Sequence, residues 1–285
     1  RGPAKRNRQP RRQGAQIRSG SLSVQAPDES RTMPATAKRT QPMSAGSANR
    51  RGAAGATPLH GPRSSASEVV PVLRRIGRAI RRMELPAIEK LQEDNAATPF
   101  RTLVSTMLSA QTRDPVTYEA SMRLFARADS PAALAALPVR TIERLIYPVS
   151  FYRNKARHLK ETARDILERF GGVTPTTMEE LLTLKGVGRK TANLVLIVAH
   201  ESPDNICVDT HVHRIANRLG WVRTRTPEQT ERALYAVAPR RWWKDINLYL
   251  VTWGQQVCRP VYPRCGTCVV AGACPRIGVT REGRL

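Results

Sequence analysis

The cysteines are the residues of this chain whose spacing points most directly to chemistry. Four of the five lie in one short segment, in the order Cys258-x6-Cys265-x2-Cys268-x5-Cys274, with prolines and glycines that make the loops tight. Four thiolates on one loop can reach a single centre, which would be a tetrahedral zinc ion or a [4Fe–4S] cluster. The spacing alone favours zinc, because structural zinc sites with four cysteine ligands are common. The odd number of cysteines and their clustering argue against a secreted disulfide framework.

Two arginines, Arg259 and Arg264, lie in the first loop of this cysteine segment. Guanidinium groups on a tight loop are well suited to contacts with phosphate oxygens. The alternative is that both side chains are ordinary solvated surface charges, and the sequence leaves both interpretations open.

A glycine-containing turn occurs within residues 184–196, which read LKGVGRKTANLVL. Gly186, Val187 and Gly188 form a tight turn that leads through Arg189 into a new helix. Backbone amides at such a turn, beside a helix N-terminus, bind phosphate without reading sequence. We therefore interpret this turn as a contact with the DNA backbone, and a plain turn between two helices is the alternative.

Lys190 is expected in the first turn of the helix that follows. The positive end of the helix dipole and burial both disfavour a cation there and favour the neutral amine. A neutral lysine amine is a nucleophile that can form a Schiff base. A surface lysine that contacts phosphate is the alternative.

Asp209 lies in the segment ICVDTHVHR, after three largely apolar residues and before another expected helix. It is either a helix N-cap, a frequent role of aspartate, or a carboxylate of a reaction site. Cys207 has no partner in the sequence pattern and is expected in the core. His211 and His213 fit helix-surface or capping positions better than metal ligation.

The segments that would position these residues have helical periodicity. Val72, Ile76 and Ile80 recur at helical spacing with arginines on the opposite face, and Pro86 breaks or kinks that helix. Further helices are expected at residues 100–109, 115–126, 131–136, 139–146, 154–170, 177–182, 189–200, 212–219, 228–236 and 245–258. No segment shows clear period-two alternation, so the predicted fold class is all-α, built from many short helices.

The chain is strongly basic, with a formal net charge of +24 and a pI of about 11.2. Residues 1–66 contain 13 Lys and Arg, only Asp28 and Glu29 as acids (13 − 2 = +11), and no aromatic residue, which predicts a disordered basic tail. The other residues carry 34 basic and 21 acidic side chains (34 − 21 = +13). The expected partner is therefore nucleic acid, with an anionic membrane surface as the second candidate.

No apolar run is long enough to span a bilayer, and the N-terminus lacks an apolar signal-peptide core. We expect a soluble intracellular protein, in the cytoplasm or nucleoid of a bacterium or in the nucleus or mitochondrion of a eukaryote. The tail has three interpretations: a solvated segment without a specific role, a source of non-specific DNA affinity, or an organellar targeting segment.

Together these segments resemble the endonuclease III family of helix-hairpin-helix DNA glycosylases. Three features occur in the family's order: the hairpin with its lysine at 184–196, the VDTH segment at 208–211, and the four-cysteine loop. A fourth, LSAQTRD at 108–114, resembles the family's early DNA-facing loop. The resemblance covers about residues 68–276. It implies that the four cysteines hold a [4Fe–4S] cluster rather than zinc. This cluster would be structural and would hold a basic loop against DNA.

The resemblance also implies roles for single residues. Lys190 matches the catalytic nucleophile that attacks the sugar C1′, and Asp209 matches the catalytic carboxylate. Gln111 resembles the residue that fills the gap left by the flipped nucleotide. Val149 and Phe151 lie where the family places apolar wedges, although Phe151 stands where the family usually has Leu. Flipping is required, because C1′ cannot be attacked in line while the base is stacked.

The implied architecture is two all-α lobes with a DNA-binding cleft between them. Residues 93–201 would form a helical barrel lobe with the helix-hairpin-helix, and residues 68–92 and 202–276 an iron–sulfur lobe. Residues 1–67 would be the basic tail and residues 277–285 a C-terminal tail. The protein is expected to act as a monomer on double-stranded DNA with damaged bases or abasic sites.

The resemblance predicts a bifunctional DNA glycosylase and AP lyase that removes oxidised pyrimidines and cleaves the strand 3′ to the abasic site by β-elimination. Adenine-specific relatives lack this lysine and have an extra C-terminal domain, whereas eleven residues follow Cys274 here. Pyrimidine dimers are the alternative substrate. Two other functions are left open: a non-catalytic DNA-binding protein with a zinc loop, and a monofunctional glycosylase that uses water in place of Lys190.

Overall fold

The structure is a computed structural model that describes residues 66–94 and 98–283. All of these residues belong to one compact unit, residues 56–285. The predicted disordered tail falls on residues 1–67, so nearly all of it lies outside the described residues, and the expectation stays a prediction.

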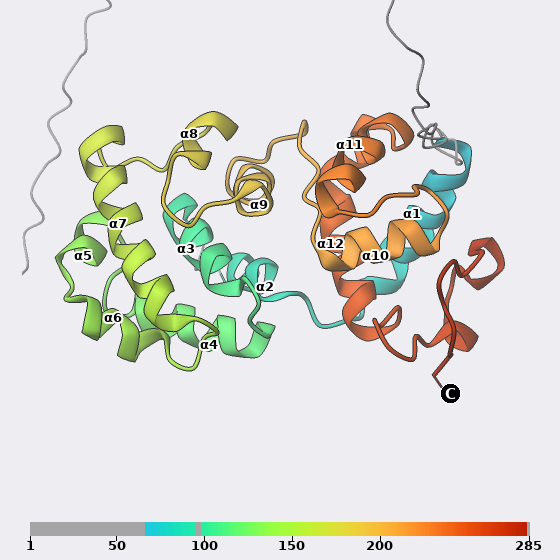
Figure 1. The fold of residues 1–285 in the computed structure, drawn as a ribbon, viewed down its shortest axis with the longest axis horizontal. Helices are drawn as coiled ribbons and strands as arrows, with labels where there is room; N and C mark the ends of the chain where they lie inside the picture. The colour runs from blue at the N-terminus through green and yellow to red at the C-terminus, as the bar shows by residue number, and fades with distance from the viewer. Residues whose placement is uncertain (1–65, 95–97, 284–285) are drawn as a thin grey trace, which may run out of the picture. The chain divides into compact units, whose positions relative to one another are not determined.

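Helices account for the regular structure of the described residues, which contain no strand, and the all-α prediction is confirmed (Figure 1). The α-helices are α1 (Ala66–Ile80), α2 (Ala87–Glu93), α3 (Pro99–Ser109), α4 (Asp114–Phe125), α5 (Pro131–Ala136), α6 (Val139–Ile146), α7 (Tyr152–Phe170), α8 (Met178–Leu182), α9 (Arg189–Ala199), α10 (Thr210–Arg218), α11 (Pro227–Val237) and α12 (Trp243–Gln256). Short 3₁₀ turns are η1 (Arg240–Trp242), η2 (Cys265–Thr267) and η3 (Ala271–Ala273). None of the described helices is both long and apolar enough to cross a bilayer.

Hydroxyl side chains begin four of these helices. Thr98, Ser130, Thr177 and Thr226 each accept a hydrogen bond from a backbone N–H in the first turn of α3, α5, α8 and α11. In α3, α5 and α11 the next residue is a proline. Its lack of an N–H costs no hydrogen bond there, because the first N–H groups of a helix have no acceptor within the helix. These local signals explain why the observed boundaries lie close to those expected from the sequence.

Helix α2 is absent from the sequence prediction. Pro86, which was expected only to break or kink the preceding helix, is also the N-cap of α2. The helix has seven residues, and its buried positions include only Ile88 and Leu91 as large apolar side chains. A segment this short gives no measurable helical periodicity. Its packing against α3 and α4 provides the stability that its sequence does not.

The first lobe is built around α3. This helix packs against α4, α7 and α9, and residues 102–108 of α3 are buried, including the polar Thr102, Ser105 and Thr106. Leu124, Leu159, Ile166 and other apolar residues of the surrounding helices complete one continuous core. Helices α3 to α9 therefore form a single helical lobe that ends in the expected hairpin (Figure 1).

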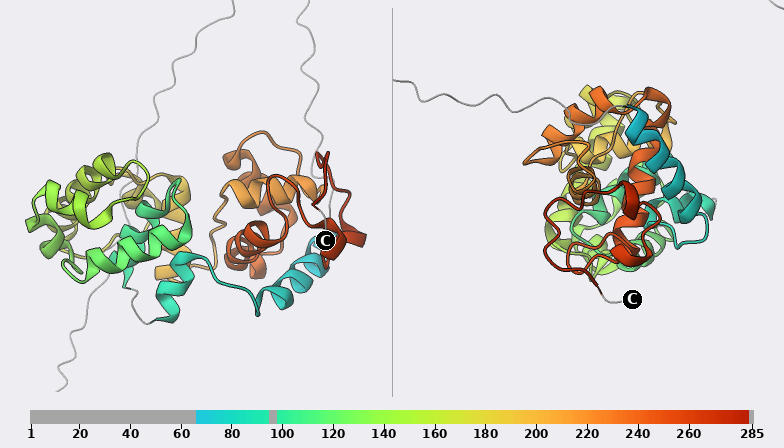
Figure 2. Two further views of the ribbon diagram at one scale, coloured as in Figure 1. Left: turned by 90° about the horizontal axis from the view of Figure 1, so that it is seen from below. Right: turned by 90° about the vertical axis from the view of Figure 1, so that its right-hand side faces the viewer.

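The second lobe combines α1 with α10, α11 and α12, which lie more than 120 residues later in the chain. The apolar face of α1 packs against α12, and the absence of a side chain at Gly77 permits this approach. A Cβ atom at Gly77 would lie 2.6 Å from Cε2 of Tyr249. Figure 2 shows α1 and α12 side by side, with the chain crossing from α1 to the first lobe.

The two lobes share hydrogen bonds as well as two chain crossings. Asp114, the first residue of α4, accepts hydrogen bonds through Oδ2 from the Ala87 N–H (3.1 Å) and from Gln255 Nε2 of α12 (3.0 Å). Helix α2 packs on α3 and α4, so residues 87–92 contact helices of the first lobe. The expected division of the chain into lobes at residues 92 and 201 stays a proposal.

Candidate active site

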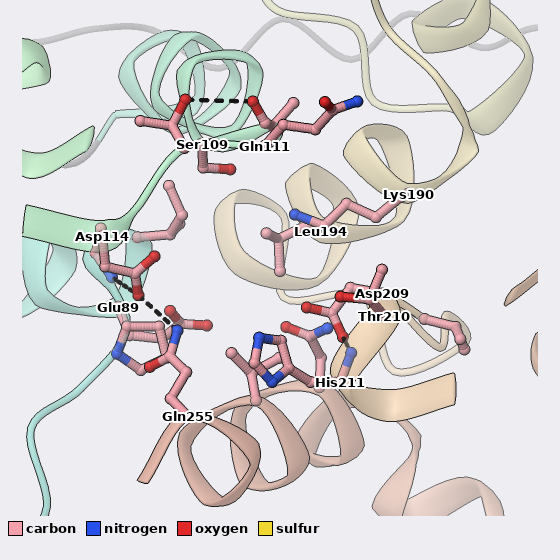
Figure 3. Close-up of a pocket in the computed structure, with 18 of the residues that line it drawn as sticks. Glu89, Ser109, Gln111, Asp114, Lys190, Leu194, Asp209, Thr210, His211 and Gln255 are labelled. Atoms are coloured by element: carbon pink, nitrogen blue, oxygen red, sulfur yellow. Dashed lines mark hydrogen bonds between the residues drawn. The ribbon is translucent and has the colours of Figure 1, made fainter. Parts of the chain in front are cut away.

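A cavity of about 880 Å³ is lined by residues from both lobes. The first lobe contributes the end of α3, the loop 110–113 and the start of α9, and the second contributes residues 208–211 and the side of α12. Lys190, Asp209 and Gln111, which are distant in the sequence, all line this cavity (Figure 3). The structure thus brings together the three residues expected at the reaction centre.

The hairpin before Lys190 is held from inside the first lobe. Leu184 and Val187 are buried in its core, and the Thr162 hydroxyl of α7 donates to the Lys185 carbonyl (2.9 Å). Gly186 has φ +77°, and a Cβ there would lie 2.8 Å from Nδ1 of His158. This position therefore requires glycine for two reasons, its backbone conformation and its close packing.

The hairpin presents its remaining backbone at the surface. Gly188 is the N-cap of α9, and a Cβ built there meets no atom within 4 Å. The first amides of a helix have no acceptor within the helix, so those of α9 are available to an anion. Val187, which was expected to contact DNA, has a buried side chain, and its N–H donates to the Leu184 carbonyl (3.2 Å).

Lys190 lies in the first turn of α9, as expected, and is partly buried. Figure 3 shows its side chain extending into the cavity. The Cys207 thiol, fully buried behind it, donates to the Lys190 carbonyl (3.5 Å). Burial raises the pKa of Cys207 to about 12, so this thiol stays protonated and is a core residue, as expected.

Asp209 is the N-cap of α10, and its Oδ1 accepts hydrogen bonds from the His211 N–H (2.8 Å) and the Val212 N–H (2.9 Å). The same carboxylate lines the cavity, close to Lys190 in the view of Figure 3. Capping is therefore compatible with a role in the site, because the cap uses only one of the two carboxylate oxygens. Within the described residues no ion pair joins Lys190 to Asp209, so both groups are open to a bound molecule.

The two histidines after Asp209 differ in position. His211 lines the cavity and its Nδ1 lies 3.1 Å from Nη2 of Arg214. Burial lowers the pKa of His211, so its ring is mainly neutral near pH 7. His213 contacts Thr230 instead, with 2.6 Å between Nδ1 and Oγ1. Neither histidine belongs to a group that could hold a metal ion within the described part of the chain.

Two carboxylates of the cavity are not among the site residues predicted from the sequence. In the sequence analysis Asp114 appears only as the last residue of the LSAQTRD segment, and Glu89 of α2 lies in no predicted motif. The pKa of Glu89 is raised from 4.5 to about 7, mainly by burial and to a smaller extent by the carboxylates of Asp114 and Asp209. A hydrogen bond from its own backbone N–H and the charge of Lys190 act in the opposite direction. Glu89 is therefore partly protonated at neutral pH and can donate a hydrogen bond into the cavity.

Gln111 follows α3 and is exposed, with φ +55°. The loop that carries it rests on Lys155 of α7, whose ammonium group donates to the Leu108 and Ala110 carbonyls. Partial burial, together with the charge of Lys190, lowers the pKa of Lys155 to about 8. No sequence signal indicates Lys155, because its contacts lie more than 40 residues earlier in the chain.

The two expected apolar wedges have opposite environments. Phe151 is 63% exposed and has φ +57° at the N-cap of α7. Val149 is 1% exposed and packs in the core of the first lobe, so its side chain cannot reach a duplex in this conformation. We therefore correct the expectation for Val149 and keep Phe151 as the single wedge candidate of this turn.

Arg189 joins the two lobes rather than extending freely from the hairpin. Its Nε and Nη2 donate to both carboxylate oxygens of Glu231 on α11, at 2.8–3.1 Å. Glu231 is buried and also accepts a bond from Asn193 Nδ2 (3.1 Å). This contact raises the pKa of Arg189 and fixes the start of α9 against the second lobe.

The four cysteines of the C-terminal loop are partly buried and line one small cavity with Arg218 and Trp253. Arg218 Nη1 donates to Cys258 Sγ (3.4 Å). The Trp253 indole N–H is buried and acts as a hydrogen-bond donor to the Cys268 thiol, which lowers the pKa of that thiol against the larger effect of burial. A cavity with four sulfurs, a cation and an indole donor suits an anionic sulfur-bound group.

The described residues contain no three His, Cys, Asp or Glu side chains placed to hold one metal ion. A tetrahedral zinc site would require sulfurs about 3.8 Å apart around a single ion. A [4Fe–4S] cluster instead takes its four cysteines at separate irons, around a larger group. Four cysteine thiolates are a suitable donor set for such a cluster. Arg259 and Arg264 are exposed on the same loop, as a phosphate contact requires.

Comparison with known proteins gives a consistent result. Residues 104–240 match the HhH-GPD superfamily, described as base excision DNA repair proteins. The chain is 47% identical to endonuclease III of Thermotoga maritima over 176 residues, which are 62% of this chain and 82% of that protein. It is 44% identical to endonuclease III-like protein 1 of Mus musculus over 188 residues, which are 64% of this chain and 63% of that protein.

Solved structures show the same similarity. A non-covalent endonuclease III–DNA complex has a TM-score of 0.67 and 28% sequence identity, over 74% of this chain and 96% of that one. A trapped endonuclease III–DNA covalent intermediate has a TM-score of 0.66 and 29% identity over the same shares of the two chains.

Proposed function

The chain belongs to the endonuclease III family of base excision repair DNA glycosylases and AP lyases, and we propose that it is a bifunctional enzyme that uses Lys190 as its nucleophile on oxidised pyrimidines in duplex DNA. One observation carries this proposal. Lys190 on α9 and Asp209 at the start of α10 open into the same cavity from different lobes, without an ion pair between them among the described residues.

In the proposed reaction the Lys190 amine attacks C1′ of the flipped nucleotide and the damaged base leaves. The Asp209 carboxylate stabilises the positive charge that develops on the sugar. The adduct at C1′ loses an amine proton, and its C1′–O4′ bond opens with protonation of O4′, which gives a Schiff base. The Schiff base acidifies the neighbouring C2′ position, and loss of a C2′ proton expels the 3′ phosphate by β-elimination. A water-using enzyme would have no need for a lysine at this position.

The lining of the cavity is suited to hydrogen bonds with an oxidised pyrimidine. Glu89, with a pKa of about 7, can donate a hydrogen bond, and the Asp114 carboxylate accepts them. An oxidised pyrimidine offers both carbonyl acceptors and N–H or hydroxyl donors to such a pair. Glu89 lines the same cavity as Lys190 and interacts with its charge, which supports recognition of the base close to the reacting carbon.

We further propose that Cys258, Cys265, Cys268 and Cys274 hold a [4Fe–4S] cluster. When bound, the cluster would cross-link a segment that contains only two short 3₁₀ turns, η2 and η3. Arg218 would donate to the cluster sulfurs and also holds the Arg259 carbonyl (2.6 Å) and the Pro260 carbonyl (2.8 Å). The loop could then present Arg259 and Arg264 to DNA phosphates, with the protein acting as a monomer.

Borohydride trapping tests the proposal. The wild-type chain is mixed with a duplex that contains one thymine glycol, or with one that contains an abasic site, and the imine is reduced. We expect a covalent protein–DNA complex with both duplexes, no complex with Lys190→Ala, and an unchanged complex with Lys244→Ala, an exposed lysine of α12 outside the cavity.

Each other result has a defined meaning. Trapping only at the abasic site would keep the lyase and exclude oxidised pyrimidines as the substrate, in favour of lesions such as pyrimidine dimers. Base release without trapping would indicate a water-using glycosylase. Zinc in place of iron, together with no base release, would support a non-catalytic DNA-binding protein.

A further inference from the structure

Two exposed residues in different segments share an unusual backbone conformation. Gln111, after α3, and Phe151, before α7, have φ values of +55° and +57°. This left-handed region is unfavourable for residues other than glycine, so the surrounding contacts must hold both residues there. The described structure contains a set of hydrogen bonds that connects the two segments.

The Thr112 hydroxyl is the centre of this set. Its oxygen accepts hydrogen bonds from the Ser150 N–H (3.2 Å) and from Lys155 Nζ (3.2 Å), and it donates to the Ala110 carbonyl (3.3 Å). A hydroxyl group has one donor and two acceptor positions, and all three are used. Thr112 follows Gln111 directly and Ser150 precedes Phe151, so this side chain joins the two left-handed residues.

Lys155 completes the connection. Its ammonium group donates to the Leu108 carbonyl (2.7 Å), the Ala110 carbonyl (2.6 Å) and the Thr112 hydroxyl, which matches its three N–H groups. Its backbone N–H donates to the Phe151 carbonyl (3.0 Å). One residue therefore contacts both segments, and its side-chain bonds are charge-assisted and partly buried, which makes them strong.

We propose that Lys155 and Thr112 are positioning residues for base extrusion, which join the Gln111 loop and the Phe151 turn into one rigid unit. The proposal rests on the proposed function. As the damaged nucleotide leaves the stack, Gln111 and Phe151 enter the space together. Because their relative position is fixed before DNA binds, no ordering is required at that step.

This role predicts a dependence on how firmly the damaged base is held. A paired and stacked lesion resists extrusion, whereas a lesion opposite an abasic-site analogue has no pairing partner. Disruption of the rigid unit should therefore slow excision of the first substrate much more than of the second. General damage to the active site would slow both equally, since the chemical step is the same.

The experiment measures single-turnover excision of thymine glycol opposite adenine and opposite a tetrahydrofuran residue. For Lys155→Met and Thr112→Val we expect a decrease of about tenfold with adenine and of less than about threefold with tetrahydrofuran. Thr112→Ser, which keeps the hydroxyl, should retain the wild-type rates. Lys160→Met is the matched control, because Lys160 also lies on α7 but donates to the Leu137 carbonyl (2.5 Å) beside α5.

The double variant Lys155→Met/Thr112→Val should be no more than about twofold slower than Lys155→Met alone, because the two residues act in one unit. Equal losses on both substrates, or wild-type rates for Thr112→Val, would overturn the proposal. If Lys155→Met does not fold, the pair Thr112→Val and Thr112→Ser decides the question. Failure of the proposed function is distinguishable, since the wild-type chain would then release no thymine glycol from either duplex.

Discussion

Asp209 caps α10, and a suitable substitution separates this cap from the catalytic role that we propose for the same side chain. Asparagine is also a good N-cap, so Asp209→Asn should keep a bond to the His211 or Val212 N–H and change the free energy of unfolding by less than about 1 kcal/mol. It removes the charge that stabilises the developing sugar cation, and we expect base excision to fall about 100-fold or more.

Urea unfolding and single-turnover excision on the same preparations measure the two effects of Asp209→Asn. Asp209→Ala is the matched comparison, because it removes the cap as well and should cost about 1 kcal/mol of stability. If excision and stability declined in parallel across the two variants, Asp209 would be a structural cap without a part in the chemistry.

Glu89 gives a pH dependence whose sign follows from its environment. Its pKa is about 7 in the folded chain and near 4.5 when unfolded. Between these values the unfolded carboxyl loses its proton first, so the contribution of Glu89 to folding is complete below about pH 4.5 and declines until about pH 7. Glu89→Gln should remove this decline, which amounts to at most about 3 kcal/mol.

The measurement for Glu89 is the difference in the free energy of unfolding between wild type and Glu89→Gln, at pH 4.5 and at pH 8. Other titrating groups contribute equally to both chains and cancel in the difference. A difference that is the same at both pH values would show that solvent reaches Glu89 and that its pKa is ordinary.

Single residues are predictable from the sequence where their signal is local. Lys190 stands directly after a glycine turn, and Asp209 directly before a helix, so neighbouring residues identify both. Glu89 and Lys155 have no such signal, because only the packing of α2 brings Glu89 to the cavity and only the packing of α7 brings Lys155 to the loop that carries Gln111. The prediction for Val149 is wrong for a related reason: an apolar residue beside an exposed turn can be wedge or core, and only the packing distinguishes them.

At the scale of helices, the contact between Arg189 and Glu231 determines how α9 meets α11. Glu231 is buried and accepts hydrogen bonds from Arg189 and Asn193. Glu231→Gln therefore leaves these two side chains with an uncharged partner. We expect a loss of about 1–3 kcal/mol in the free energy of unfolding, measured in urea.

Asp204→Asn is the matched control for Glu231→Gln. Asp204 also pairs with an arginine, Arg240, but its side chain is 56% exposed, and exposed pairs contribute less than about 1 kcal/mol. Equal effects of the two substitutions would mean that burial does not strengthen the Arg189–Glu231 contact. A loss confined to Glu231→Gln would confirm it as the stronger connection between α9 and α11.

Helices can be predicted from the sequence where a cap or a clear periodicity marks them. The expected segments at 131–136 and 139–146 have the bounds of α5, which Ser130 caps, and of α6, which begins after Pro138 without a side-chain cap. The unpredicted helix α2 has neither a side-chain cap nor two full turns. It nevertheless carries Glu89 and lines one side of the cavity, so one of the residues that sequence reasoning missed lies on the helix that it missed.

For the whole molecule, the sequence predicts an all-α chain but not the cavity. Two lobes and a cleft come from the resemblance to a family, because no periodicity indicates that α1 packs with helices more than 120 residues later. The net charge, in contrast, can be assigned to segments directly. About half of it, +11 of +24, belongs to residues 1–66, and the rest belongs to residues 67–285.

This distribution of charge leads to a prediction for the intact chain. Removal of residues 1–65 should weaken binding to undamaged duplex DNA and reduce the salt dependence of that binding. The slope of log K against log salt should become shallower by about 0.9 for each phosphate that the shorter chain no longer neutralises. The single-turnover excision rate at saturating enzyme should not change, because the cavity is built only from residues 84–256.

The matched control for the truncation keeps residues 1–65 and replaces their 13 Lys and Arg with Gln. If charge alone matters, this chain and the truncated chain should have the same salt slope, since counterion release depends on the number of phosphates neutralised. An unchanged slope in both would mean that the tail does not contact DNA and that residues 67–285, with a net charge of +13, account for all of the binding. A slower excision rate in either of these two chains would instead indicate that the tail takes part in the reaction.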